Sequence, residues 1–181
     1  MVSRFDRDVG MMLARLKQLG IDRNTLVIVT SDNGPTYNGG TDSAFFESAK
    51  GLRGLKGQLY EGGIRTPLIM SWPGRIKPGT QSPFVTASWD LFPTFAAIAG
   101  ASADGLVLDG VDLTALMTSG VTPSTRPPCY WEYASGGGWQ AVRLGSFKAV
   151  RRQAKQQGVL ELYDLDADPE ERRDVAVLHP D

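Results

Sequence analysis

Two short segments carry the residue types that could do chemistry. The first is Asp32-Asn33-Gly34, which directly follows the apolar, β-branched run 25–30. In open α/β sheets, ligands bind beyond the carboxyl ends of the strands. A carboxylate beside a carboxamide offers the hard oxygen ligands that suit Ca²⁺ or Mg²⁺. Asp-Asn-Gly is also good turn chemistry, so a plain turn is the alternative from local sequence alone.

The second segment, residues 51–65, places the cations Arg53, Lys56 and Arg65 among several glycines. Glycine lets backbone approach a ligand closely, and Lys and Arg bind tetrahedral oxyanions. An exposed basic loop with no ligand is the alternative. Taken alone, this segment therefore only suggests an anion site.

The elements around these segments predict an α/β layer. Apolar residues at helical spacing predict a helix near residues 3–20, with Ser3 as its cap and Gly20 as its stop. The apolar run 25–30 does not alternate, which predicts a strand that is buried on both faces of a parallel sheet. Residues 66–72 predict a second buried strand. The stretch 31–63 between them shows no sustained period and is too long for an ordinary loop, which favours a functional role.

The rest of the chain changes character. A helix is predicted over 88–99, with Ser88 as its cap, and a short helix over 112–117. Gly145-Ser146 is a two-residue hairpin signal, and Asp168-Pro169 predicts the start of a final helix. Short strands are predicted at residues 129–133, 140–144, 147–151 and 159–163.

Composition excludes several classes of function. The 181 residues carry 19 basic and 20 acidic side chains, so no basic excess indicates a nucleic-acid partner. No apolar run is long enough to predict a membrane span. With Cys129 as the single cysteine and His179 as the single histidine, a disulfide framework and a zinc site of the usual Cys or His kind are excluded. Cys129 is expected to be a small core residue and His179 a solvated tail residue.

Taken together, the segments resemble a known family. T-S-D-N-G, followed by G-L-R-G-L-K-G-Q-L-Y-E-G-G-I-R-T-P-L-I-M-S-W-P-G, looks like the C-terminal half of a sulfatase of the arylsulfatase type, with the alkaline-phosphatase-like fold. W-Q-A-V-R-L-G-S-F-K and the closing L-Y-D-L-D-A-D-P-E resemble the family in the same order. The resemblance covers nearly the whole chain.

The resemblance implies roles for individual residues. Asp32 and Asn33 match the pair that closes the family's Ca²⁺ site, and Lys56 matches the lysine that contacts a sulfate oxygen. Tyr60, Glu61 and Arg65 match positions that look structural, and an arginine buried beside Glu61 is expected. The family's nucleophile is a formylglycine made from Cys or Ser in C/S-x-P-x-R, in the N-terminal half. Ser71-Trp-Pro-Gly-Arg75 fits that pattern by letter, but it lies in the wrong place and is interpreted as a coincidence.

The resemblance also implies that Met1 falls within a long helix of the family, so the chain is expected to be the C-terminal part of a longer reading frame. The implied fold is α/β: residues 1–122 form part of the sulfatase sheet-and-helix core, and residues 123–181 form a small antiparallel subdomain with a final helix. An incomplete sheet would leave an exposed strand edge, through which the chain would self-associate.

The implied function is hydrolysis of a sulfate ester on a carbohydrate or aryl group, with Ca²⁺ as cofactor. The isolated chain is expected to be inactive because it lacks the nucleophile. The alternatives are a phosphatase, phosphodiesterase or phosphonate hydrolase of the same superfamily, or a non-catalytic binding protein. The substrate, the oligomeric state and the compartment stay open, although relatives are often exported to the periplasm or secreted.

Overall fold

The computed structural model describes residues 2–156 and 158–180, so the expectation for Met1 lies outside the described residues. The chain forms two compact units, each made from two segments. The first unit runs up to Thr30 and resumes over Leu68–Arg126, and the second combines Ser31–Pro67 with the residues from Pro127 onward. Within the described residues, no helix is both long enough and apolar enough to cross a membrane. The predicted division at residues 122/123 stays a prediction about the family's domains.

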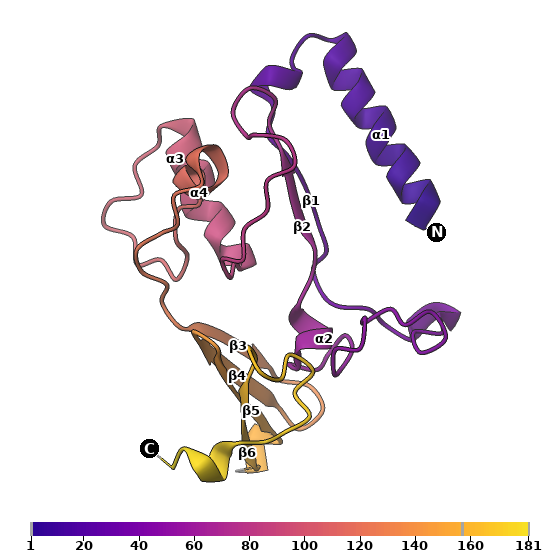
Figure 1. Ribbon diagram of the computed structural model, residues 1–181, viewed down its shortest axis with the longest axis vertical. Coiled ribbons are helices and arrows are strands. Elements are labelled where there is room, and N and C mark those ends of the chain that lie inside the picture. Colours follow the sequence, from indigo (N-terminus) through magenta and orange to yellow (C-terminus); the bar gives the residue numbers. More distant parts are fainter. Residues whose placement is uncertain (1, 157, 181) are drawn as a thin grey trace. The chain divides into compact units, whose positions relative to one another are not determined.

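The first unit begins with helix α1 (Val2–Gln18), shown in indigo in Figure 1. Gly20 adopts φ 68°, and its N–H donates to the Lys17 carbonyl while that of Ile21 donates to the Leu16 carbonyl. This left-handed C-terminal turn confirms the predicted stop at Gly20. The predicted cap was wrong, because Ser3 already lies inside the helix.

Strands β1 (Val27–Thr30) and β2 (Leu68–Ser71) form a two-stranded antiparallel sheet, in which Val27 pairs with Ser71 and Thr30 with Leu68. The parallel pairing predicted for this region was therefore wrong for these two strands. Neither strand is fully buried, because among the described residues each has a single neighbour. The apolar side chains of β1 instead line a groove of about 550 Å³ together with one face of α1. The predicted self-association through this sheet edge stays a prediction.

Helix α3 (Leu91–Ala99) is held by a buried carboxylate. The Asp90 side chain accepts hydrogen bonds from the backbone N–H groups of Ala87 and Val111, at 2.7 and 2.9 Å, and pairs with Arg126. The predicted cap at Ser88 was wrong, because Ser88 lies inside a 3₁₀ turn, Ser88–Asp90, and the Asp90 carboxylate binds the backbone N–H of Ala87, which begins that turn. Gly100 ends α3 in the left-handed conformation, as predicted, and α4 (Thr114–Ser119) begins two residues later than predicted.

The second unit is built on the four-stranded antiparallel sheet β3-β4-β5-β6 (Figure 1). Its order follows the sequence, so each strand pairs with the next, and Leu144 faces Phe147 across the predicted Gly145-Ser146 hairpin. The strands agree with the four predicted runs within one residue or so. Their bounds are β3 (Cys129–Tyr133), β4 (Trp139–Leu144), β5 (Phe147–Arg152) and β6 (Leu160–Asp164).

One face of this sheet buries Ala141, Val150 and Tyr163 against Leu59 and Tyr60, which come from the long segment before β2. That segment contains the short helix α2 (Glu61–Ile64). Burial of this apolar surface is what attaches residues 31–67 to the sheet.

The predicted final helix is absent from the described residues after β6. The Asp168 side chain accepts a hydrogen bond from the Arg173 backbone N–H, and Glu171 takes φ 54°, a left-handed conformation that interrupts an α-helix. Among the described residues that follow, the one helical element is a 3₁₀ turn, Ala176–Leu178. The reason lies in the interior: this conformation delivers the Glu171 carboxylate into a fully buried position.

Candidate functional site

The predicted metal ligands lie in a braced turn directly after β1. The Ser31 hydroxyl donates to the Asn33 carbonyl at 2.9 Å, and the Asn33 side-chain nitrogen donates to the Gly34 carbonyl at 2.9 Å. This engages the donor end of the Asn33 carboxamide and leaves its oxygen for a ligand. The Asp32 carboxylate is exposed. The pair thus presents oxygen donors of the kind that Ca²⁺ prefers.

Gly34 fixes this turn onto helix α2. Its N–H donates to the Gly63 carbonyl at 2.8 Å. A Cβ placed on Gly34 would lie 1.9 Å from the Gly62 carbonyl oxygen, so only glycine permits this approach. The Asp-Asn-Gly turn is therefore part of a close backbone contact, which a plain surface turn would not need.

Helix α2 is itself enclosed by the loop that carries Lys56. The Gly62 N–H donates to the Arg53 carbonyl at 2.7 Å, and a Cβ on Gly63 would lie 2.0 Å from the Gln58 carbonyl oxygen. The Lys56 N–H donates to the Pro35 carbonyl at 2.8 Å, and its side chain is exposed. The turn with Asp32 and Asn33 and the loop with Lys56 thus share one backbone scaffold.

Arg53 is half-buried and bound to this scaffold and to the sheet. Its guanidinium lies over the Tyr60 ring, 3.8 Å from the ring centre, and donates to the Tyr163 hydroxyl and the Glu171 carbonyl at 2.8 and 2.9 Å. Of the three cations in segment 51–65, Arg53 therefore stabilises the fold.

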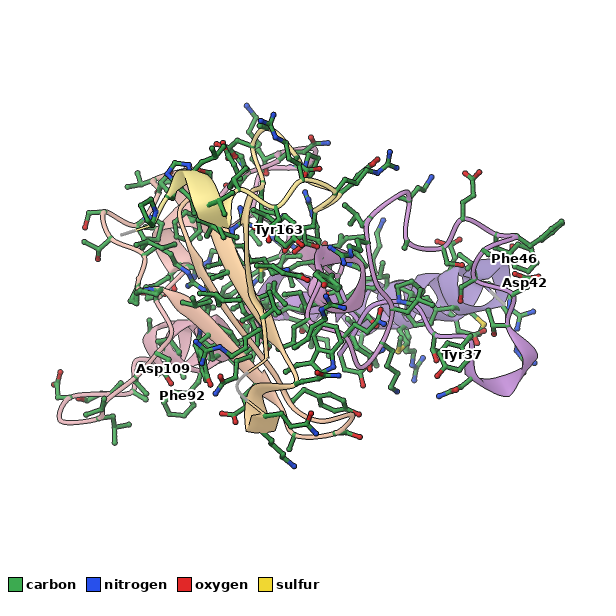
Figure 2. All side chains as sticks on the ribbon, turned by 90° about the horizontal axis from the view of Figure 1, so that it is seen from below. Tyr37, Asp42, Phe46, Phe92, Asp109 and Tyr163 are labelled. Atoms are coloured by element: carbon green, nitrogen blue, oxygen red, sulfur yellow. The ribbon has the colours of Figure 1, made fainter. Side chains whose placement is uncertain are left out.

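A carboxylate holds the two tyrosine hydroxyls of this cluster. Glu161 accepts hydrogen bonds from Tyr60 and Tyr163 at 2.5 and 2.9 Å, and from Arg152 at 2.6 Å. Burial, together with the hydrogen bond to Glu161, raises the pKa of Tyr163 to about 12 and raises that of Tyr60 as well. Both phenols stay protonated at physiological pH. Figure 2 shows Tyr163 beside the sheet.

A second cluster, which sequence reasoning missed, surrounds Lys148 on β5. The fully buried Lys148 ammonium lies 2.9 Å from one carboxylate oxygen of Glu61 and 2.9 Å from one of Glu171. The other Glu171 oxygen accepts the Glu61 backbone N–H at 2.6 Å. Burial raises the pKa of Glu171, and the Lys148 charge opposes that rise. The sequence signal was slight: Lys148 is one of three cations in the strand Phe147–Arg152, and nothing in its local pattern marks it as buried.

The expectation for Arg65 needs correction. Its side chain is 60% exposed and lies 3.9 Å from the Glu61 carboxylate. The fully buried cation beside Glu61 is Lys148 from β5, at 2.9 Å. Arg143 from β4 is the arginine with a largely buried side chain, 18% exposed and 3.7 Å from the Glu61 carboxylate. The structural interpretation of Tyr60 and Glu61 agrees with their burial.

The other sequence candidates lie on other elements of the chain. Cys129 is buried, as predicted, and His179 is exposed with its ring 5.1 Å from that of Phe147. The S-x-P-x-R match begins at the end of β2 and continues into a turn. Over the described part of the chain, no three His, Cys, Asp or Glu side chains are grouped to hold a metal ion. Any metal bound at Asp32 and Asn33 would need further ligands.

The loop between Pro35 and Gly51 is ordered by internal hydrogen bonds and presents aromatic side chains. The buried Ser43 hydroxyl donates to the Thr36 carbonyl at 2.6 Å, which closes the loop. Tyr37 and Phe46 extend outward from it (Figure 2).

Comparisons with known proteins agree on one family. Residues 1–101 match the family described as Sulfatase, and residues 55–178 match N-sulphoglucosamine sulphohydrolase, C-terminal. Human arylsulfatase A is 39% identical over 150 residues, which is 80% of this chain and 28% of that protein. The N-acetylgalactosamine-6-O-sulfatase of Bacteroides thetaiotaomicron is 28% identical over 213 residues, covering 99% of this chain and 38% of the relative.

Solved structures give the same result. The crystal structure of Ps i-CgsB in complex with k-i-k-neocarrahexaose superposes with a TM-score of 0.83 at 30% identity, covering 99% of this chain and 38% of that chain. A protein crystallised with its substrate D-glucosamine-2-N,6-O-disulfate gives a TM-score of 0.76 at 27% identity, covering 96% and 34%. The chain thus spans roughly a third of the length of these relatives. On both sequence and structure, it belongs to the sulfatase family and corresponds to the C-terminal portion of its members.

Proposed function

We propose that this chain supplies the C-terminal part of the active site of a Ca²⁺-dependent sulfuric ester hydrolase. Asp32 and Asn33 would contribute oxygen ligands to Ca²⁺, and the Lys56 ammonium would contact the sulfate group of a carbohydrate or aryl ester. The supporting observation is that the Gly34–Gly63 and Lys56–Pro35 hydrogen bonds hold these three residues on one scaffold. Family membership supplies the reaction class.

The chemistry of the donor set fits this proposal. A carboxylate and a carboxamide oxygen suit a hard cation, and bound Ca²⁺ would supply positive charge to orient a sulfate ester. The Lys56 side chain would offset negative charge on sulfate oxygens as the ester bond breaks. Its exposure leaves the ammonium accessible to such an anion.

The nucleophile of the proposed reaction would come from residues outside this chain. Cys129 is buried, and Ser71 of the S-x-P-x-R match pairs with Val27, at the end of β1 opposite to the one that leads into Asp32, so neither is proposed as the source of a formylglycine. Purified chain 1–181 is therefore expected not to hydrolyse an aryl sulfate. Hydrolysis that Lys56→Ala abolishes would contradict this expectation.

A chimera tests the positive part of the proposal. The N-terminal region of the Bacteroides thetaiotaomicron relative, joined to residues 1–181 in place of its own C-terminal portion, should hydrolyse a sulfate ester in a Ca²⁺-dependent way. Asp32→Ala should raise the Ca²⁺ concentration needed for half-maximal rate at least tenfold, whereas Asp42→Ala in the neighbouring loop should not. Preference for phosphate or phosphonate esters over sulfate esters would favour the superfamily alternative. A Ca²⁺ response that Asp32→Ala leaves unchanged would refute the assignment.

A further inference from the structure

Lys148 is a fully buried cation that joins two segments far apart in the sequence. Its ammonium on β5 lies 2.9 Å from Glu61, at the start of α2, and 2.9 Å from Glu171, in the segment after β6. All three side chains are almost completely removed from water. A buried ion pair brings little net stability over an apolar packing of the same shape, so its presence calls for another explanation.

A short series of hydrogen bonds connects this cluster to the turn that carries the proposed metal ligands. The Glu61 N–H is held by the Glu171 carboxylate at 2.6 Å, and Glu61 is the first residue of α2. Two residues later, the Gly63 carbonyl accepts the Gly34 N–H at 2.8 Å. Gly34 follows Asp32 and Asn33 directly. A shift of the Glu61 end of α2 is therefore transmitted to the turn that carries both proposed ligands.

We propose that Lys148 is a positioning residue: by pairing with Glu61 and Glu171 it holds α2 in the place where Gly63 binds Gly34, and so it fixes the Asp32-Asn33 turn. Lys148 lies on the four-stranded sheet and is not itself a proposed ligand. The sheet would therefore influence the geometry of Asp32 and Asn33 indirectly, through α2. The inference rests on the proposed function only in its last step, from the geometry of the turn to metal binding.

The charges around the cluster define what removal of Lys148 would do. Glu61 also faces Arg143 and Arg65, at 3.7 and 3.9 Å, and Arg53 donates to the Glu171 backbone carbonyl. Glu171 has no other side-chain cation at hydrogen-bond distance among the described residues. In Lys148→Met, Glu171 would be a desolvated carboxylate beside Glu61, and its pKa, already raised by burial, would rise further. Protonation would relieve the repulsion at low pH but not at higher pH.

Amide hydrogen exchange measured by NMR on chain 1–181 tests the proposal. The readouts are the protection factors of the Gly34 and Lys56 amides, with the amides of the β4–β5 pair as reference. In Lys148→Met at pH 7.5, Gly34 and Lys56 should lose about 100-fold in protection, as expected when a buried pair loses one partner. At pH 5 the loss should be at most about tenfold, and the reference amides should change much less at either pH.

Two further variants separate positioning from general stability. Arg151→Met removes a cation from the exposed end of the same strand and should leave the Gly34 protection within about threefold of that of the parent chain. Lys148→Met/Glu171→Gln removes the unpaired charge while keeping an oxygen for the Glu61 N–H, and it should restore most of the protection at pH 7.5.

The proposal is overturned if Lys148→Met leaves Gly34 protected at pH 7.5. It is also overturned if the loss is the same at both pH values, or equal in the loop and the sheet, because either pattern would indicate only general destabilisation. If Lys148→Met is too unstable to show native amides, the double variant Lys148→Met/Glu171→Gln decides the question. The proposal then requires the Gly34 amide to be protected in the double variant. None of these outcomes depends on hydrolysis, so failure of the proposed function would be seen separately in the chimera.

Discussion

Replacing Gly34 by alanine should disrupt the scaffold that joins the Asp-Asn turn to α2. The new Cβ would lie 1.9 Å from the Gly62 carbonyl oxygen and 3.0 Å from the Gly63 Cα, so the backbones must separate by about 1 Å. Helix α2 cannot retreat easily, because a Cβ on its far side at Gly62 would already lie 2.3 Å from the Gly54 carbonyl oxygen. The separation breaks the Gly34–Gly63 hydrogen bond.

The magnitude follows from these contacts. Loss of the hydrogen bond costs about 1 kcal/mol, and forcing an extra methyl into close-packed backbone costs about 1–3 kcal/mol. We therefore expect the free energy of unfolding of the second unit to fall by about 2–4 kcal/mol. Gly39→Ala is the matched control: Gly39 lies in the same loop, with φ 73° and open space around its Cβ position. It should cost only about 1–2 kcal/mol, from the left-handed backbone.

Urea unfolding followed by tryptophan fluorescence measures both variants. Trp131 and Trp139 pack against the core of the second unit, so a Trp72→Phe/Trp89→Phe background restricts the signal to that unit. A loss for Gly34→Ala no larger than that for Gly39→Ala would refute the reasoning, because it would mean that α2 does not confine the turn.

Two further predictions concern the buried hydrogen-bonded clusters. The pKa of Tyr163 is about 12 in the folded chain and about 10 for a tyrosine in an unfolded chain. Between these two pH values the unfolded chain loses a proton that the folded chain keeps, so the contribution of Tyr163 to stability should fall by about 2–3 kcal/mol as the pH rises. Tyr163→Phe should reduce this alkaline slope in urea unfolding, while Tyr60, whose pKa is also raised, retains its own part, and an unchanged slope would contradict the prediction. In the first unit, Asp90→Ala should lower the free energy of unfolding by about 3–5 kcal/mol, because it removes the carboxylate that binds Arg126 and two backbone N–H groups. Asp104→Ala, at an exposed position, is the control. Equal shifts in the thermal unfolding midpoint for the two variants would contradict this role of Asp90.

The sequence predicted the second sheet well because its signals are local. Alternating short runs and the Gly145-Ser146 turn determine neighbouring strands that pair in order. The direction of pairing between β1 and β2 was not predictable in this way, because 37 residues separate Thr30 from Leu68 and no turn chemistry connects them. An apolar run indicates that a strand is buried, but it does not indicate which element of the fold buries the strand.

The prediction of a final helix was wrong for a different reason. Asp168-Pro169-Glu170-Glu171 is a good helix start by local propensity, but the Glu171 carboxylate is drawn into the interior by Lys148 and the Glu61 N–H. Tertiary contacts of this kind override local preference. The same contacts explain why Lys148 was missed: its partners are 87 and 23 positions away in the chain, and a lysine on a strand is ordinarily solvated.

The candidate site was predictable only through the order of its motifs. Asp32, Asn33 and Lys56 were singled out as a set because the motifs that contain them resemble those of sulfatases and follow in the same order. The glycine contacts that hold them together were visible only as an unexplained excess of glycine in residues 31–63. The close backbone approach at Gly34, Gly62 and Gly63 is the physical reason for part of that excess.

The most direct test of the central claim is the hydrolysis of an aryl sulfate by the chimera carrying Lys56→Ala, compared with Lys50→Ala. Both lysines are exposed and lie six residues apart, so the two variants remove the same charge from one segment. If Lys56 contacts the reacting sulfate, its removal should lower kcat/KM by about 10²–10³-fold, as expected for loss of one group that stabilises developing charge, while Lys50→Ala stays within about threefold. Equal, small effects of the two substitutions would show that Lys56 lies outside the active site and would contradict the proposed function.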